Sequence, residues 1–209
     1  GESIPIINFI ENNNIKLKYI LNTHHHYDHI GGNLELKKRY QSKIVAFEGD
    51  KDRIPEIDFL VQDNQTWKVD NFEAKIYHTP GHTNGHIVFH FFNDKKIFTG
   101  DTLFSLGCGR IFEGTFQQMF NSLCKIKKIP KETEIYCGHE YTLQNSNFCI
   151  QHDPENLQLK NKIVKIKKKL ENNLPTIPTT LADELDTNIF LKAKNIETFS
   201  KLRDLKDNY

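Results

Sequence analysis

Histidine and aspartate side chains that could bind metal ions gather in one short stretch near the start of the chain. The segment reads THHHYDH at positions 23–29 and is followed by an isoleucine and two glycines. Imidazole nitrogens and carboxylate oxygens are the donors that divalent transition metals such as zinc take from proteins. In an extended backbone, His24 and His26 point to the same side and can chelate one ion. Asp28 and His29 come directly afterwards and can be aimed at a second ion.

Three later segments offer further donors, each at the end of a predicted strand. His82, Asp101 and His139 each stand next to a glycine just after an apolar stretch. Alone, each of them is more typical of turn chemistry than of metal binding. Together with the first segment they complete a set for two ions, since a carboxylate can offer one oxygen to each ion. The predicted sites are His24, His26 and His82; Asp28, His29 and His139; and Asp101 as the bridge.

The composition sets bounds on the rest of the molecule. The chain has 209 residues, enough for one large domain or one domain with a small annex. A formal net charge of +1 gives no reason to expect nucleic-acid or membrane binding, and no apolar run reaches the length of a membrane span. The four cysteines form no CxxC pair, so we expect free thiols in a reducing compartment, the cytoplasm.

Strands and helices alternate over the first two thirds of the chain. Apolar patterning predicts strands over 17–21, 43–47, 72–78, 87–92, 96–99 and 134–137, and helices over 4–10, 33–40 and 115–128. Helical patterns then dominate, over 141–151, 155–171 and 195–207. We therefore expect an α/β domain over residues 1–140 that carries the metal donors, and a mostly helical domain over residues 141–209.

This order of motifs resembles the metallo-β-lactamase superfamily and, within it, glyoxalase II, the hydroxyacylglutathione hydrolases. The matching signatures are THHHYDHIGGN at 23–33, GDTLF at 100–104 with GCGRIFEG at 107–114, and CGHEYT at 137–142. The resemblance implies an αββα sandwich, two stacked sheets between helices, with a C-terminal helical domain that closes over the site and binds substrate. It also implies hydrolysis of the thioester of S-(2-hydroxyacyl)glutathione, usually S-D-lactoylglutathione, to glutathione and a 2-hydroxy acid such as D-lactate, in methylglyoxal detoxification.

The resemblance further implies roles for single residues. Two divalent ions per chain are expected, Zn²⁺ first, although these donors also accept iron or manganese. Asp28 and Asp101 would position a hydroxide that bridges the two ions. Positions that match the family's substrate contacts are Arg110, Phe112, Tyr141, Arg203 and Lys206. The last two share one face of the final predicted helix through their i, i+3 spacing. The expected partner is a glutathione thioester substrate. We also expect the chain to be a monomer.

One departure from the family pattern concerns the first sheet. Only 23 residues precede His24, room for one helix and one strand, whereas the resembled family has several more strands there. We therefore expect a sandwich that lacks its N-terminal strands, either because the gene product is truncated or because another segment fills that edge. His25 is expected to point away from the ligands, and His86 to be a hydrogen-bonded support.

Two alternative functions remain open at this point. An iron-dependent persulfide dioxygenase of the same superfamily would use one iron and has no need of His139 or of the Arg203 and Lys206 pair. A truncated, non-catalytic relative would act as a scaffold, and the complete donor set argues against it because drift is expected to break ligands first.

Overall fold

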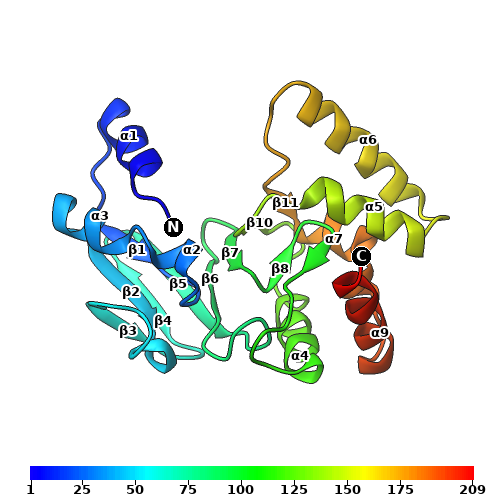
Figure 1. Ribbon diagram of the computed structural model, residues 1–209, viewed down its shortest axis with the longest axis horizontal. Helices are drawn as coiled ribbons and strands as arrows, with labels where there is room; N and C mark the ends of the chain where they lie inside the picture. Colours follow the sequence, from blue (N-terminus) through cyan, green and yellow to red (C-terminus); the bar gives the residue numbers. More distant parts are fainter.

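Two facing sheets with helices on their outer sides, extended by a helical region, make up the computed structural model, which describes residues 1–209 (Figure 1). In chain order the elements are α1 (Ile4–Asn12), β1 (Tyr19–Leu21), α2 (Tyr27–Ile30), α3 (Asn33–Tyr40), β2 (Lys43–Phe47), the 3-10 turn η1 (Glu48–Asp50), β3 (Phe59–Val61), β4 (Thr66–Val69), β5 (Phe72–His78), β6 (Ile87–Phe91), β7 (Lys96–Gly100), β8 (Leu103–Phe104), β9 (Gly107–Cys108), α4 (Phe116–Ile126), β10 (Glu134–Cys137), α5 (Thr142–His152), α6 (Leu157–Glu171), β11 (Thr179–Thr180), α7 (Leu181–Thr187), α8 (Ile189–Lys192) and α9 (Ile196–Asp207).

The sandwich pairs a small sheet with a large one. The small sheet is parallel, in the order β1-β2-β3, and the large sheet has the order β11-β10-β7-β6-β5-β4. Strand alternation sends Ala74 and Ile76 of β5 into the space between the sheets, where they meet Val45 of β2 and Phe89 of β6. The apolar face therefore fixes the register of each strand.

Helices cover the outer faces of both sheets. Ile44 and Ala46 of β2 pack outward beneath α2, while Val88 and Ile97 of the large sheet pack against a continuous cluster that runs through α4 into the helical region. α4 is started by a capping box in which Thr115 and Gln118 satisfy each other's backbone donors. The predicted αββα sandwich with a C-terminal helical region is thus confirmed. The predicted boundary at residue 140 lies between β10 and α5 and stays a prediction.

A groove opens at one edge of the small sheet. β1 lies at the edge of that sheet, and beside it a groove of about 550 Å³ opens between the sheets. Tyr19, Trp67 and Phe91 line this groove, and Phe98 of the large sheet is 40% exposed there. The large sheet is therefore only partly covered by the small one.

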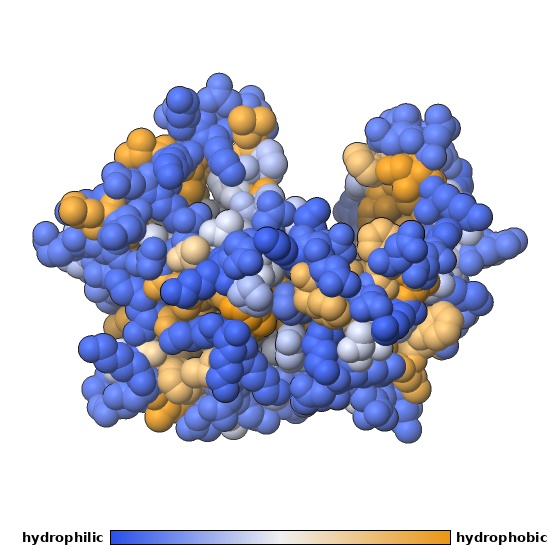
Figure 2. All heavy atoms as spheres, turned by 180° about the vertical axis from the view of Figure 1, so that it is seen from behind, coloured by the Kyte–Doolittle hydropathy of each residue, from blue (hydrophilic) through white to orange (hydrophobic).

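The face seen in Figure 2 is mostly polar, with apolar side chains in separate groups. Seen from behind, it is hollowed between the two raised ends that carry α1 and α6 (Figure 2). None of the helices combines the length and the apolar character that a bilayer-spanning helix needs.

A buried carboxylate ties the helical region to the sandwich. Glu184 of α7 is fully buried, accepts the backbone N–H of Leu106 at 2.8 Å and the hydroxyl of Ser105 at 3.2 Å, and forms an ion pair with Lys162 of α6. Ser105 and Leu106 form the turn between β8 and β9, directly after the predicted ligand Asp101. The ion pair therefore holds the helices against the hairpin that follows a ligand.

Replacement of the lysine tests this tie. Lys162→Met would leave Glu184 as an unpaired buried charge, so the free energy of unfolding should fall by about 3–5 kcal/mol. Lys165→Met, at an exposed position of the same helix, serves as the control and should change it little. Urea denaturation of both variants measures the difference. Equal stabilities would mean that the pair does not hold the helical region in place.

Candidate metal centre

The predicted metal donors all stand on short segments that follow strands. His24 and His26 follow β1, Asp28 and His29 belong to α2, and His82 lies in the loop between β5 and β6. Asp101 follows β7, and His139 follows β10, which is parallel to β7. Strand ends on two facing sheets meet at one edge of the sandwich, so residues 115 positions apart in the chain come together.

The donors form two adjoining groups. The donor atoms of His24, His26 and His82 lie within 4.8 Å of one another, and those of Asp28, His29 and His139 do the same. In the first group His82 Nε2 is 3.0 Å from His26 Nδ1. In the second, His139 Nε2 is 3.3 Å from His29 Nε2 and 3.2 Å from Asp28 Oδ2.

Asp101 lies between the two groups. Its Oδ1 is 3.3 Å from His29 Nε2, and its Oδ2 is 3.5 Å from His82 Nε2 and 3.4 Å from His139 Nε2. The residue is only 6% exposed. The structure thus brings all seven donors together, with this carboxylate near members of both groups; His24, His29 and Asp101 also have donor atoms within 4.8 Å of one another.

Unsatisfied buried atoms indicate that these donors fit metal ions. His24 Nε2 and Asp101 Oδ1 are buried and have no hydrogen-bond partner, although most buried polar groups in proteins have one. Burial, together with the nearby imidazoles of His86 and His29, lowers the pKa of His24 far below its usual range. A neutral ring with a free lone pair is what a metal ion binds, and nitrogen and oxygen donors suit divalent ions.

Hydrogen bonds from outside the cluster hold the donors in place. His82 Nδ1 donates to the carbonyl of Arg110 at 2.7 Å, which leaves Nε2 as the atom that faces the other ligands. His86 is fully buried, and its Nε2 accepts the backbone N–H of Asp101 at 3.0 Å. Its Nδ1 lies 3.1 Å from the hydroxyl of Thr79. Burial keeps the pKa of His86 well below its ordinary value. His86 is thus a support, as the sequence led us to expect.

A cavity of about 560 Å³ opens over the donors. Phe112 stands 62% exposed at its rim, with its ring centroid 5.2 Å from that of His82, and Tyr141 stacks on His139 at 5.0 Å. Arg110 lines the same cavity, together with two residues that the sequence did not single out, Tyr27 and Phe104. Tyr27 lies in the motif at 23–33 and Phe104 in the motif at 100–104, so membership in these motifs could have identified them as lining residues.

The two predicted residues of α9 lie behind this cavity and do not line it. Arg203 is buried and donates to the carbonyl of Cys108 at 2.8 Å and to Asp207 at 2.9 Å. Lys206 has no hydrogen-bond partner for its ammonium group, which lies 5.0 Å from the ring centroid of Phe148, and burial lowers its pKa. Their side chains therefore reach different partners, although they share a helix face.

Asp207 links α9 to the cavity and was missed in the sequence. Its Oδ1 is 2.9 Å from the guanidinium of Arg203 and 3.7 Å from Nε of Arg110, which lines the cavity. The i, i+4 spacing of Arg203 and Asp207 was the available signal.

Burial disfavours the thiolate form of the two cysteines near the site. Burial raises the pKa of Cys137 to about 11 and also raises that of Cys108. Both groups therefore stay protonated at neutral pH, and the thiolate is the reactive form.

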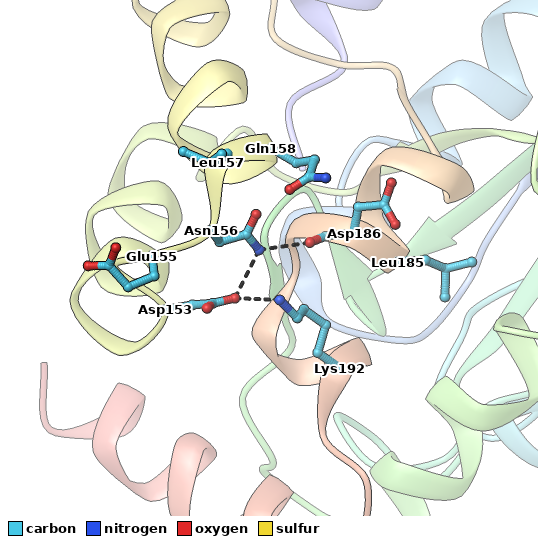
Figure 3. A pocket seen from close by; sticks show the side chains of 8 residues that line it. All are labelled: Asp153, Glu155, Asn156, Leu157, Gln158, Leu185, Asp186 and Lys192. Atoms are coloured by element: carbon cyan, nitrogen blue, oxygen red, sulfur yellow. Dashed lines mark hydrogen bonds and ion pairs between the residues drawn. The ribbon is translucent and has the colours of Figure 1, made fainter.

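A second hollow, of about 480 Å³, lies on the helical region and has carboxylates but no histidine among its lining residues (Figure 3). Asp153 points to Lys192 and to the side-chain amide of Asn156, which also donates to the carbonyl of Asp186. Asp153, Asn156 and Lys192 thus bind one another, and the candidate site is the donor cluster at the edge of the sandwich.

Comparisons with known proteins agree with this geometry. Residues 3–139 match the model of the metallo-beta-lactamase superfamily, and residues 140–209 match that of the hydroxyacylglutathione hydrolase C-terminus. A hydroxyacylglutathione hydrolase of Pelagibacter ubique (strain HTCC1062) is 64% identical over 100% of this chain and 87% of its own length. One of Prochlorococcus marinus (strain MIT 9301) is 49% identical over 97% of this chain and 83% of its own length.

Solved structures support the fold alone, because their sequences are distant. The BLEG-1 B3 metallo-beta-lactamase superposes with a TM-score of 0.71 at 20% identity, over 92% of this chain and 86% of that one. ETHE1 from Myxococcus xanthus also gives a TM-score of 0.71, at 22% identity, over 96% of this chain and 74% of that one.

Replacement of His86 tests its support of Asp101. His86→Leu leaves the buried N–H of Asp101 without an acceptor, so we expect metal affinity to fall by about 10–100-fold, as for other residues that orient ligands. Competition with a chelating dye measures this affinity. His152→Leu, at an exposed position, is the control. Unchanged affinity in His86→Leu would contradict the support role.

Proposed function

This chain belongs to the metallo-β-lactamase superfamily and, within it, to the hydroxyacylglutathione hydrolases, and we propose that its metal centre hydrolyses the thioester of S-D-lactoylglutathione and related S-(2-hydroxyacyl)glutathiones. The products are glutathione and a 2-hydroxy acid, D-lactate in the main case. The observation that carries the proposal is the convergence of seven donors, two of them with unsatisfied buried atoms, beneath a cavity whose rim bears Arg110 and Tyr141.

Two divalent ions, most simply Zn²⁺, are proposed to occupy the site. His24, His26 and His82 would hold the first ion, Asp28, His29 and His139 the second, and Asp101 both. Such ions lower the pKa of a water molecule and polarise a carbonyl oxygen. Asp101 and Asp28 would position the attacking water. The side chain of Asp28 is 55% exposed on the cavity side, so its carboxylate can accept a hydrogen bond from that water.

The remaining residues would bind the glutathione end of the substrate and so position its acyl group over the metal donors. The side chain of Arg110 is 60% exposed at the cavity rim and can meet a carboxylate of the peptide. Tyr141 and Phe112 supply aromatic walls. Arg203 and Lys206 do not line the cavity, and their substrate role stays a prediction from the resemblance. The leaving thiol has an ordinary pKa of about 8.5, so it can depart as a thiolate with little help from an acid.

The two alternative functions have less support. The match of residues 140–209 to the hydroxyacylglutathione hydrolase C-terminus favours the thioesterase over a persulfide dioxygenase. The complete donor set speaks against a non-catalytic relative. The expected monomeric state and cytoplasmic location stay predictions.

Hydrolysis of S-D-lactoylglutathione tests the proposed reaction. We expect zinc-loaded protein to remove the thioester absorbance, a chelator to abolish the activity, and added Zn²⁺ to restore it. Asp101→Asn, which removes the shared negative charge, should lower kcat at least about 100-fold, in the range that removal of one electrostatic stabiliser costs. No turnover by protein that holds metal, or activity that survives complete metal removal, would refute the proposal.

Replacement of Arg110 tests the glutathione end separately. Arg110→Ala should raise KM roughly tenfold, equivalent to about 1.4 kcal/mol, with a smaller change in kcat, because a remote binding contact is lost. Arg39→Ala, which removes a surface arginine from α3, is the control. Steady-state kinetics with S-D-lactoylglutathione measures both constants. A KM that does not change would remove Arg110 from the substrate site.

A further inference from the structure

A second group of charged side chains lies beside the ligands, and the proposed reaction does not use it. Asp50, the last residue of η1, is fully buried. Its Oδ1 accepts hydrogen bonds from Arg53, at 3.1 Å from Nε and 2.6 Å from a terminal guanidinium nitrogen. The other terminal nitrogen of Arg53 donates to Glu113 at 2.7 Å. We call Asp50, Arg53 and Glu113 the acid–arginine network.

The network contacts both loops that carry the first group of ligands. Glu113 accepts the backbone N–H of Asn84 at 2.7 Å, two residues after His82. His25, between His24 and His26, places its Nε2 3.4 Å from Glu113 and its Nδ1 3.6 Å from Asp50. The side chain of His25 thus points away from the ligands, as expected, and it points into the network.

Close backbone packing joins the second loop to the same carboxylate. A Cβ atom on Gly85 would lie 1.9 Å from Oδ1 of Asp50, so only glycine allows this approach. The loop that carries His82 is therefore held to Asp50 by contact and to Glu113 by a hydrogen bond. The network makes no hydrogen bond or ion pair to Asp28, His29 or His139.

We propose that Asp50, Arg53 and Glu113 are positioning residues that fix the His26 loop against the His82 loop and thereby set the affinity of the first metal site selectively. The inference rests on the proposed function, because it assumes two ions. When the loops are already ordered before the ion binds, no binding free energy is lost in ordering them. The donors of the second site stand on α2 and after β10, and the network makes no hydrogen bond or ion pair to them.

Metal-binding measurements on an arginine variant test this selectivity. Arg53→Met removes the central cation, and Arg53→Lys keeps a cation that can make fewer hydrogen bonds. Arg39→Met is the control: it breaks another arginine–glutamate ion pair, the exposed pair of Arg39 with Glu11. Metal content and competition with a chelating dye give the number of Zn²⁺ ions and both dissociation constants. Thermal unfolding of the metal-free proteins reports stability separately.

We expect wild-type protein and Arg39→Met each to bind two ions, and the dissociation constant of each site to be the same in both proteins. In Arg53→Met one site should weaken by about 10–100-fold while the other stays within about twofold, and Arg53→Lys should recover part of the loss. Equal weakening of both sites, or a lower melting temperature with both affinities unchanged, would overturn the positioning role. Wild-type protein that binds fewer than two ions would instead refute the two-ion proposal.

Discussion

The mutual crowding of unsatisfied metal donors around Asp101 is the constraint on which the rest of the structure depends. Imidazoles and two carboxylates meet with the donor atoms of each group within 4.8 Å of one another, and His24 Nε2 and Asp101 Oδ1 find no partner in the chain. Burial of such atoms is unfavourable unless a ligand satisfies them. The arrangement is therefore costly for the fold by itself, and it becomes favourable once cations share the donors.

The surrounding structure supports this costly arrangement from several sides. His86 holds the backbone of Asp101 from its position just before β6, and the acid–arginine network holds the loops of His26 and His82. The Glu184–Lys162 pair fastens the helical region to the hairpin that follows Asp101. Each support acts through backbone or loop contacts, so the donor atoms themselves stay free to bind metal.

Much of this could be predicted from the sequence, because it depends on local spacing. Alternation in 72–78 predicted β5, and strand-end donors at 24–29, 82, 101 and 139 predicted the cluster. The sequence patterns missed several short elements, since tertiary hydrogen bonds rather than periodicity define them; these are strands β3, β4, β8, β9 and β11 and helices α2, α7 and α8. Likewise Asp50, Arg53 and Glu113 are 63 positions apart at most and carry no motif that would join them. The different directions of Arg203 and Lys206 depend on packing against Cys108 and Phe148, which spacing alone does not encode.

The central claim is that these seven donors hold two ions that share Asp101. Anomalous diffraction at the zinc absorption edge, from crystals of protein grown with Zn²⁺ in slight excess over two ions per chain and no other metal, tests it most directly. We predict two anomalous peaks, one among His24, His26 and His82 and the other among Asp28, His29 and His139, both within bonding distance of Asp101. A single peak, or peaks that do not contact Asp101, would contradict the account.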